Sequence, residues 1–135
     1  MRRALFVRTN RVANAVVRRL GLRRFRGGDL LYLTTTGRRS GQERTTPALY
    51  LVDEGRWIVV ASNGGADWEP GWWLNLRAGT PARIEVEGVT TAVVGTEVDG
   101  PERERLWARL NEMFDFDAYQ RKVSRRIAVV ALTPA

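Results

Sequence analysis

Residues 29–53 read DLLYLTTTGRRSGQERTTPALYLVD, in which two apolar and threonine-rich segments flank a short polar turn. β-Branched and aromatic side chains of this kind are typical of β-strands, and they predict strands over 29–36 and 44–53. Gly37 and Gly41 stand in the turn, where glycine lets the backbone reverse direction tightly. The stretch therefore predicts a long antiparallel hairpin.

Downstream of this hairpin, the hydrophobic pattern predicts the rest of a small antiparallel domain. A continuous apolar run at 57–61 predicts a strand buried on both faces, and strict alternation at 82–87 predicts a second hairpin that ends near residue 98. The remaining predicted elements are helices over 72–76, 101–114 and 116–122 and a last buried strand over 127–132. We expect an α+β fold, mainly antiparallel, in which about six strands form a partly open barrel with inserted helices.

The amino-acid composition limits the kinds of catalytic site that the chain can form. The chain has 135 residues, 44% of them hydrophobic, which suits one domain with its own core. It contains no cysteine and no histidine, so disulfides, Ser-His or Cys-His nucleophiles and ordinary metal clusters are not expected. Difficult chemistry would then belong to a bound cofactor. No apolar run matches a membrane span or a signal peptide, and we expect a cytoplasmic protein.

The net charge of +7 is concentrated at one end of the chain. Residues 1–26 hold nine arginines and no acid, which leaves 13 basic and 15 acidic residues in 27–135. Apolar residues recur at helical spacing within 1–26 and predict a basic amphipathic helix ahead of a cofactor-binding domain over 27–135. Three interpretations stay open for this helix: packing on its own domain, peripheral contact with an anionic membrane, and nucleic-acid binding.

The turn of the first hairpin suggests an anion cradle. Arg38, Arg39 and Arg44 offer forked N–H donors that suit phosphate and carboxylate groups. The alternative is a solvated basic hairpin tip. The carboxylate pair Glu85 and Glu87 alternates on an exposed strand face, so solvation explains it more simply than acid-base catalysis does.

Several segments together resemble the deazaflavin-dependent nitroreductase family. They are Leu33–Pro47 around the arginine turn, Ala61–Gly65, Pro70–Leu76, the region of Tyr119 and Gln120, and the final strand. The resemblance implies a split β-barrel like that of FMN-binding oxidases, in an actinobacterial oxidoreductase. It also implies hydride transfer from reduced coenzyme F-420 to a quinone, a nitroaromatic or an activated alkene.

The resemblance also assigns roles to residues. Arg38, Arg39 and Arg44 would bind the phosphate and the polyglutamate tail of the coenzyme, helped by Ser40 and Gly41. Ser62 and Tyr119 would be the catalytic residues, with orientation of the acceptor as the safer role, and no metal is implied. The further residues implied for cofactor binding are Pro47, Val60, Ala61, Ser62, Asn63, Gly64, Gly65, Trp72 and Asn75.

Three departures from the family pattern bear on the substrate. Asn63 stands where the best-known members have a basic residue, and Leu49 stands where some relatives have tyrosine. The stretch 114–117 replaces a region rich in tyrosine. A pocket with more hydrocarbon and fewer hydroxyls follows, so we expect a quinone or another apolar acceptor to be favoured over nitroimidazole prodrugs.

Two alternatives remain at this level. The same barrel could bind FMN in place of F-420. A small basic barrel with tryptophans could also stack bases and bind phosphates without catalysis. The concentration of arginine in residues 1–26, away from any strand face, counts against the nucleic-acid alternative.

Overall fold

The computed structural model describes residues 23–25 and 28–135. Over residues 28–135 the predicted order of strands and helices is confirmed, with every predicted end within two residues of the observed one, and the short 3₁₀-helix is added. The elements are β1 (Arg24–Phe25), β2 (Gly28–Thr36), β3 (Glu43–Asp53), β4 (Arg56–Val60), the 3₁₀-helix η1 (Asn63–Gly65), α2 (Gly71–Arg77), β5 (Ala82–Val86), β6 (Val89–Glu97), α3 (Gly100–Met113), α4 (Phe116–Lys122) and β7 (Val129–Pro134).

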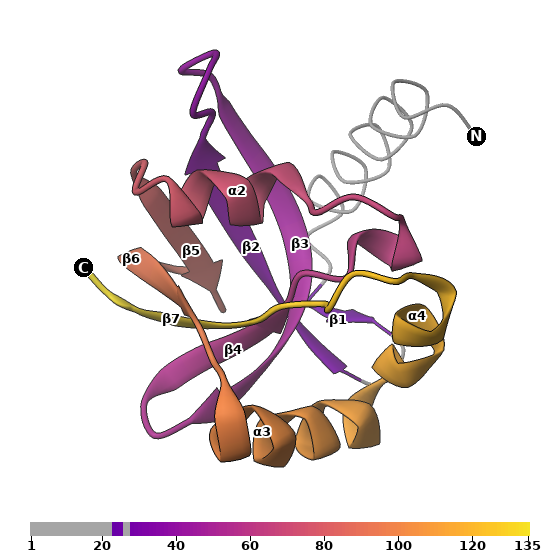
Figure 1. The fold of residues 1–135 in the computed structure, drawn as a ribbon. Coiled ribbons are helices and arrows are strands. Elements are labelled where there is room, and N and C mark those ends of the chain that lie inside the picture. Colours follow the sequence, from indigo (N-terminus) through magenta and orange to yellow (C-terminus); the bar gives the residue numbers. More distant parts are fainter. Residues whose placement is uncertain (1–22, 26–27) are drawn as a thin grey trace.

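Six strands form a closed antiparallel barrel (Figure 1). They run in the order β2-β3-β4-β7-β6-β5, and β2 pairs with β5 to close the ring. Leu33 lies opposite Thr46 of β3 on one side and opposite Ile84 of β5 on the other. The expected α+β fold with about six strands is confirmed, whereas the sequence did not predict this closure.

The strand β4 is buried on both faces, as its continuous apolarity predicted. Val59 points into the barrel and packs in the cluster that contains Leu31, Ile84 and Trp73. Ile58 and Val60 pack in a second cluster with residues of α3 and α4. The barrel interior and this helix-covered face are therefore two separate cores, and both β4 and β7 contribute buried residues to each of them.

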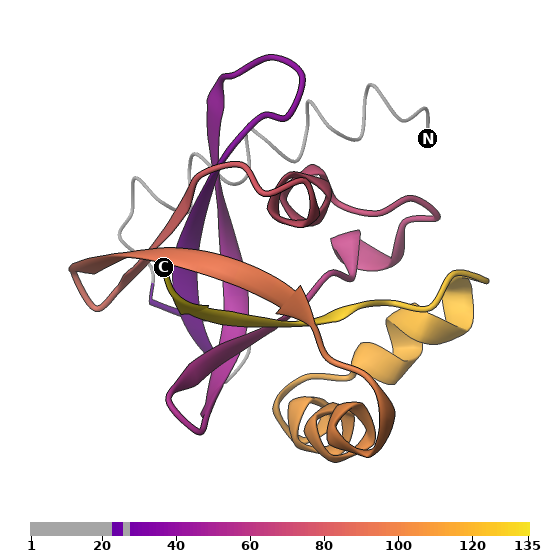
Figure 2. The same ribbon diagram turned by 60° about the vertical axis from the view of Figure 1, so that its left-hand side comes forward.

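The helices lie on different sides of the barrel (Figure 2). In both views α2 and α3 lie on opposite sides, and η1 lies between α2 and α4. Trp73 and Leu76 of α2 pack into the barrel cluster, whereas Leu106 and Leu110 of α3 pack in the second cluster. The helix α2 thus runs from η1 toward the tip of the β2–β3 hairpin.

The helix predicted over residues 1–26 lies mostly outside the described residues. The prediction is wrong for its last residues. Arg24 and Phe25 form the strand β1, which pairs with Asp29 and Gly28 of β2. The β5 strand covers the edge of β2 only from Tyr32 onward. Without β1 this edge of the first residues of β2 would keep unpaired ladder groups, so backbone pairing outweighs the helical pattern at Arg24 and Phe25.

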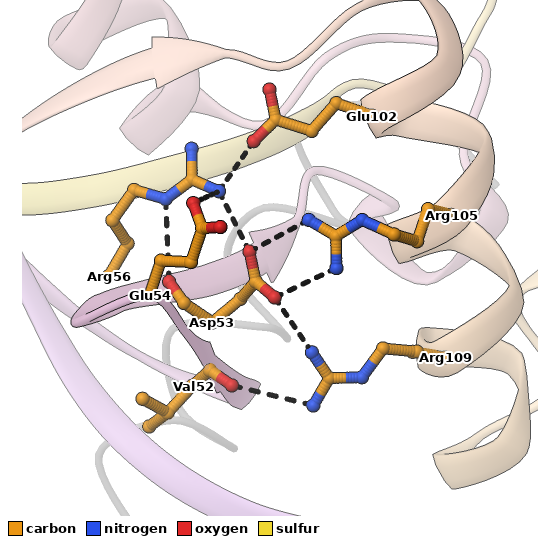
Figure 3. A network of polar contacts seen from close by, with 7 residues as sticks. All are labelled: Val52, Asp53, Glu54, Arg56, Glu102, Arg105 and Arg109. Carbon is orange, nitrogen blue, oxygen red and sulfur yellow. Dashed lines mark hydrogen bonds and ion pairs between the residues drawn. The ribbon is translucent and has the colours of Figure 1, made fainter.

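One buried carboxylate ties α3 to the β3–β4 corner (Figure 3). The Asp53 side chain is only 7% exposed and accepts hydrogen bonds from Arg56, Arg105 and Arg109 at 2.8 to 3.0 Å. Hydrogen bonds from Arg105 and then from Arg56 hold the pKa of Asp53 well below its ordinary value. Glu102 shares Arg56, so five charges from β3, β4 and α3 meet at this corner.

Candidate active site

The tip of the β2–β3 hairpin is a compact turn held by its own backbone. Gly37 N–H donates to Gln42 O at 2.8 Å, and Gly41 N–H donates to Gly37 O at 2.9 Å. Gly41 has a φ of 70°, which favours glycine. The Ser40 Oγ accepts a hydrogen bond from Gln42 N–H at 3.1 Å, so this hydroxyl first serves the turn.

Arg38 and Arg39 of this turn and Arg44 at the start of β3 lack an acidic partner among the described residues. Arg38 donates from its backbone and from Nη1 to Asn75 Oδ1, both at 3.1 Å. Arg44 donates to Gln42 Oε1 at 2.6 Å and to the Glu43 carbonyl at 3.0 Å. The nearby Glu43 carboxylate is paired with Arg83 instead. The turn therefore presents positive charge that the described part of the chain does not neutralise.

Asn75 lies at the arginine turn and is only 6% exposed. Its Oδ1 accepts both hydrogen bonds from Arg38, and its Nδ2 donates to Thr35 Oγ1 at 3.0 Å. Thr80 Oγ1 bridges the Asn75 carbonyl and the Thr36 carbonyl at 3.1 and 2.7 Å. The structure thus gives Asn75 a clear part in positioning Arg38, while direct contact with the cofactor stays a prediction.

The loop after β4 and the helix α4 meet at a glycine. Three successive residues have left-handed φ values: Asn63 at 49°, Gly64 at 63° and Gly65 at 82°. A Cβ at Gly65 would lie 3.1 Å from Cδ1 of Tyr119. The two predicted catalytic positions, Ser62 and Tyr119, are therefore brought to the same part of the molecule.

Asn63 uses its side chain within this loop. Its Nδ2 donates to the Trp68 carbonyl at 3.1 Å. An asparagine side chain tolerates the left-handed conformation better than most residues do. Asn63 in this chain therefore stabilises the loop through its side chain.

The other residues predicted to contact the cofactor belong to two different hydrophobic clusters. Ala61 is fully buried and Trp72 is partly buried against the barrel cluster. Val60 belongs to the cluster under α3 and α4, together with Tyr119. Pro47 lies on the same face of β3 as Leu49, which packs on that second cluster, whereas Arg44 lies on the opposite face. These predicted contacts therefore do not share one face.

Sequence reasoning missed Arg125, which binds the same loop. Its guanidinium donates to the carbonyl oxygens of Ala61, Ser62 and Ala66 at 3.1 to 3.2 Å. Burial lowers the pKa of Arg125, and the charges of Glu69 and Asp67 oppose that shift. No short-range pattern could reveal the role, because donor and acceptors lie 59 to 64 residues apart in the chain.

The geometry defines a class of protein. Asn75 in the last part of α2 binds Arg38 of the arginine turn, and before the start of α2 a glycine-rich loop lies against Tyr119. Such a barrel suits a ligand with an anionic tail and a flat ring. It is a cofactor-binding barrel.

Comparison with known proteins identifies the family. The model of the F420H(2)-dependent quinone reductase family matches residues 6–134. The F420H(2)-dependent quinone reductase Rv1261c of Mycobacterium tuberculosis is 39% identical over 109 residues, which cover 76% of this chain and 72% of that protein. The chain belongs to the F420H(2)-dependent quinone reductase family.

Solved structures agree with this assignment. The F420-H2 dependent reductase FDR-A is 29% identical, with a TM-score of 0.68 over 77% of this chain and 93% of that chain. HutZ, a heme storage protein from Vibrio cholerae, has a TM-score of 0.60 at 16% identity over 87% of this chain and 88% of that chain, and shows the fold alone. The resemblance stated from the sequence is confirmed, and the FMN and nucleic-acid alternatives are not favoured.

The chain is thus an oxidoreductase that depends on reduced coenzyme F-420. The residues fit this cofactor on chemical grounds. Its phosphodiester and glutamate carboxylates require cationic donors, and Arg38, Arg39 and Arg44 lack acidic partners among residues 23–25 and 28–135. Within that same part, no helix is both long and apolar enough to cross a bilayer.

Proposed function

We propose that Arg38, Arg39 and Arg44 bind the phosphate and tail carboxylates of F-420, while the Ser62–Gly65 loop and Trp72 hold its ring. The observation that carries this proposal is the unneutralised charge of the arginine turn. Arg38 is already oriented by Asn75, so little rotamer freedom remains to be lost when an anion binds. Charge-assisted, forked hydrogen bonds then provide most of the affinity for the tail.

Reduced F-420 supplies a hydride, and the protein residues position the acceptor. The Tyr119 ring lies against Gly65, three residues after Ser62, and the hydroxyls of Ser62 and Tyr119 would hydrogen-bond an acceptor oxygen. The Tyr119 ring is itself held by Phe114 and Phe116, at centroid distances of 5.4 and 6.5 Å. A fixed aromatic wall favours a reactive arrangement, with the reacting atoms about 3–3.5 Å apart.

The same wall supports a quinone as the acceptor. Leu49, Met113 and Phe114 pack against the same apolar cluster as Tyr119, and the Lys122 ammonium lies 5.5 Å from the centre of the Tyr119 ring. An apolar quinone ring gains more from such a surface than a polar nitroimidazole does. We propose that nitroaromatic and alkene acceptors react more slowly than quinones.

Charge removal at the turn tests the binding site. In the double variant Arg38→Gln, Arg39→Gln we expect the Kd for F-420 to rise by about 10- to 100-fold per arginine, because each loses a charge-assisted hydrogen bond. The matched control is Arg126→Gln, which removes an exposed guanidinium paired with Asp99. Quenching of tryptophan fluorescence measures binding, and oxidation of reduced F-420 with a quinone and a nitroaromatic measures turnover. Equal affinity of the double variant and the control would refute the arginine site.

The sequence of residues 1–26 supports one more proposal. Nine arginines and a helical apolar pattern suit peripheral contact with an anionic membrane. Deletion of these residues should weaken sedimentation with anionic liposomes while the Kd for F-420 stays within about threefold. A loss of cofactor binding on deletion would instead make the segment part of the ligand site.

A further inference from the structure

Arg125 holds the carbonyl side of the Ser62 loop. Its Nη1 donates to Ala61 O at 3.2 Å, and its Nη2 donates to Ser62 O at 3.1 Å. Its Nε and Nη2 both donate to Ala66 O, at 3.2 and 3.1 Å. No carboxylate pairs with this guanidinium in the part of the chain that the structure describes. Three carbonyls of one loop thus take the place of an acidic partner.

The N–H groups of the same peptides point the other way. A trans peptide directs its C=O and its N–H in opposite directions, and the described residues contain no cis peptide. Because the Ala61 and Ser62 carbonyls face Arg125, the N–H groups of Ser62 and Asn63 face away from it. Neither amide has an acceptor among the described residues.

The backbone conformation brings these two amides together. Ser62 is right-handed, with φ −76° and ψ −28°, and Asn63 is left-handed, with φ 49°. A right-handed residue followed by a left-handed one forms a concave pair of N–H donors, which binds an anionic or carbonyl oxygen. Asparagine tolerates this conformation, and the Arg125 hydrogen bonds to the Ala61 and Ser62 carbonyls fix the orientation of the two peptides.

Gln120 links this arrangement to α4. Its Nε2 donates to the Arg125 carbonyl at 2.8 Å, and its Oε1 accepts from Ile127 N–H at 2.9 Å. Gln120 follows Tyr119 in the same helix. The backbone that carries Arg125 is therefore fixed by the helix that also carries the predicted catalytic phenol.

We propose that Arg125 is a positioning residue, which presents the Ser62 and Asn63 amides as a donor pair for an oxygen of the F-420 ring system. The inference rests on the proposed function and deepens it. Arg38, Arg39 and Arg44 would bind the anionic tail, and the Arg125-supported loop would bind the ring. A substitution in one of these two sites should then weaken binding of only the part of F-420 that this site holds.

Two probes separate them: F-420 itself and its deazaflavin chromophore without phosphate and tail. In Arg125→Lys the charge stays but the three-carbonyl fork is lost. We expect the Kd for both probes and the KM for reduced F-420 to rise about tenfold, with kcat changed less than about threefold. Arg38→Gln should weaken only the binding of intact F-420. The matched control Arg126→Lys should leave both Kd values unchanged, because Arg126 pairs with Asp99 outside the loop.

The outcomes are distinct. If the wild-type protein binds both probes and Arg125→Lys binds them within twofold, the role of Arg125 is wrong while the proposed function stands. If the wild-type protein binds neither probe, the proposed function fails and the inference fails with it. Should Arg125→Lys not fold, Gln120→Met tests the same support, because it releases the Arg125 backbone. A Kd for the tail-free chromophore that Gln120→Met leaves unchanged would also overturn the inference.

Discussion

At the scale of single residues, substitution of two neighbouring glycines distinguishes the cost of backbone strain from the cost of a steric contact with a side chain. Gly64 and Gly65 both have positive φ, but a Cβ at Gly64 meets nothing within 4 Å, whereas one at Gly65 lies 3.1 Å from Tyr119. We expect Gly64→Ala to cost about 1 kcal/mol from the left-handed conformation alone. Gly65→Ala should cost more and displace the phenol.

Urea denaturation and quinone turnover measure this pair. The predicted order of stability is wild type, then Gly64→Ala, then Gly65→Ala, with turnover reduced mainly in the last variant. Equal stability and equal turnover of the two variants would show that the contact between Gly65 and Tyr119 affects neither folding nor turnover.

At the scale of elements, the corner between β3, β4 and α3 depends on one ionised carboxylate. The pKa of Asp53 is held below its unfolded value, so the folded state gains stability wherever the carboxylate is charged in both states. That gain is complete above the ordinary pKa of about 4 and is lost as the pH falls further toward the lowered pKa. We expect acid to loosen the attachment of α3.

The variant Asp53→Asn tests this attachment. It leaves Arg56, Arg105 and Arg109 without their shared carboxylate. The free energy of unfolding should fall at neutral pH and depend less on pH below about 5 than in the wild type. The control Asp29→Asn breaks the exposed ion pair with Arg24, which contributes little. Parallel stability-pH curves for wild type and Asp53→Asn would contradict the prediction.

At the scale of the whole molecule, the barrel depends on the closure between β2 and β5. Leu33 and Ile84 face each other across this seam, and both are fully buried. Leu33→Ala or Ile84→Ala should lower the free energy of unfolding by about 2–5 kcal/mol, because each leaves a cavity in the barrel core. Val94→Ala on the outside of β6, where the side chain is 51% exposed, serves as the control and should change it by less than about 1 kcal/mol.

Chemical denaturation followed by tryptophan fluorescence reports this difference. Trp73 packs in the same cluster as Leu33 and Ile84, so it senses loss of the barrel core directly. A cost at the seam no larger than that of Val94→Ala would mean that the sheet stays stable without its closure.

The local pattern of the sequence was sufficient for the elements and for the chemistry of the arginine turn. Alternation and apolar runs depend on side chains a few residues apart, so β3, β4 and α4 could be predicted from their own residues. The arginines of the turn could also be identified from the sequence, because glycines and cations within one short segment predict a tight turn and an anion-binding site. The family resemblance then supplied the ligand, through residues in their order along the chain.

Only the tertiary structure decided how these parts meet. The closure of β2 on β5, the strand at Arg24–Phe25 and the hold of Arg125 on the Ser62 loop all join groups through hydrogen bonds between separate elements. Backbone groups are alike at nearly every residue, so the sequence does not show which of them pair, or which carbonyls a distant arginine binds. Side-chain pattern therefore determined the elements and the charge of the site, and backbone pairing across the fold determined its shape.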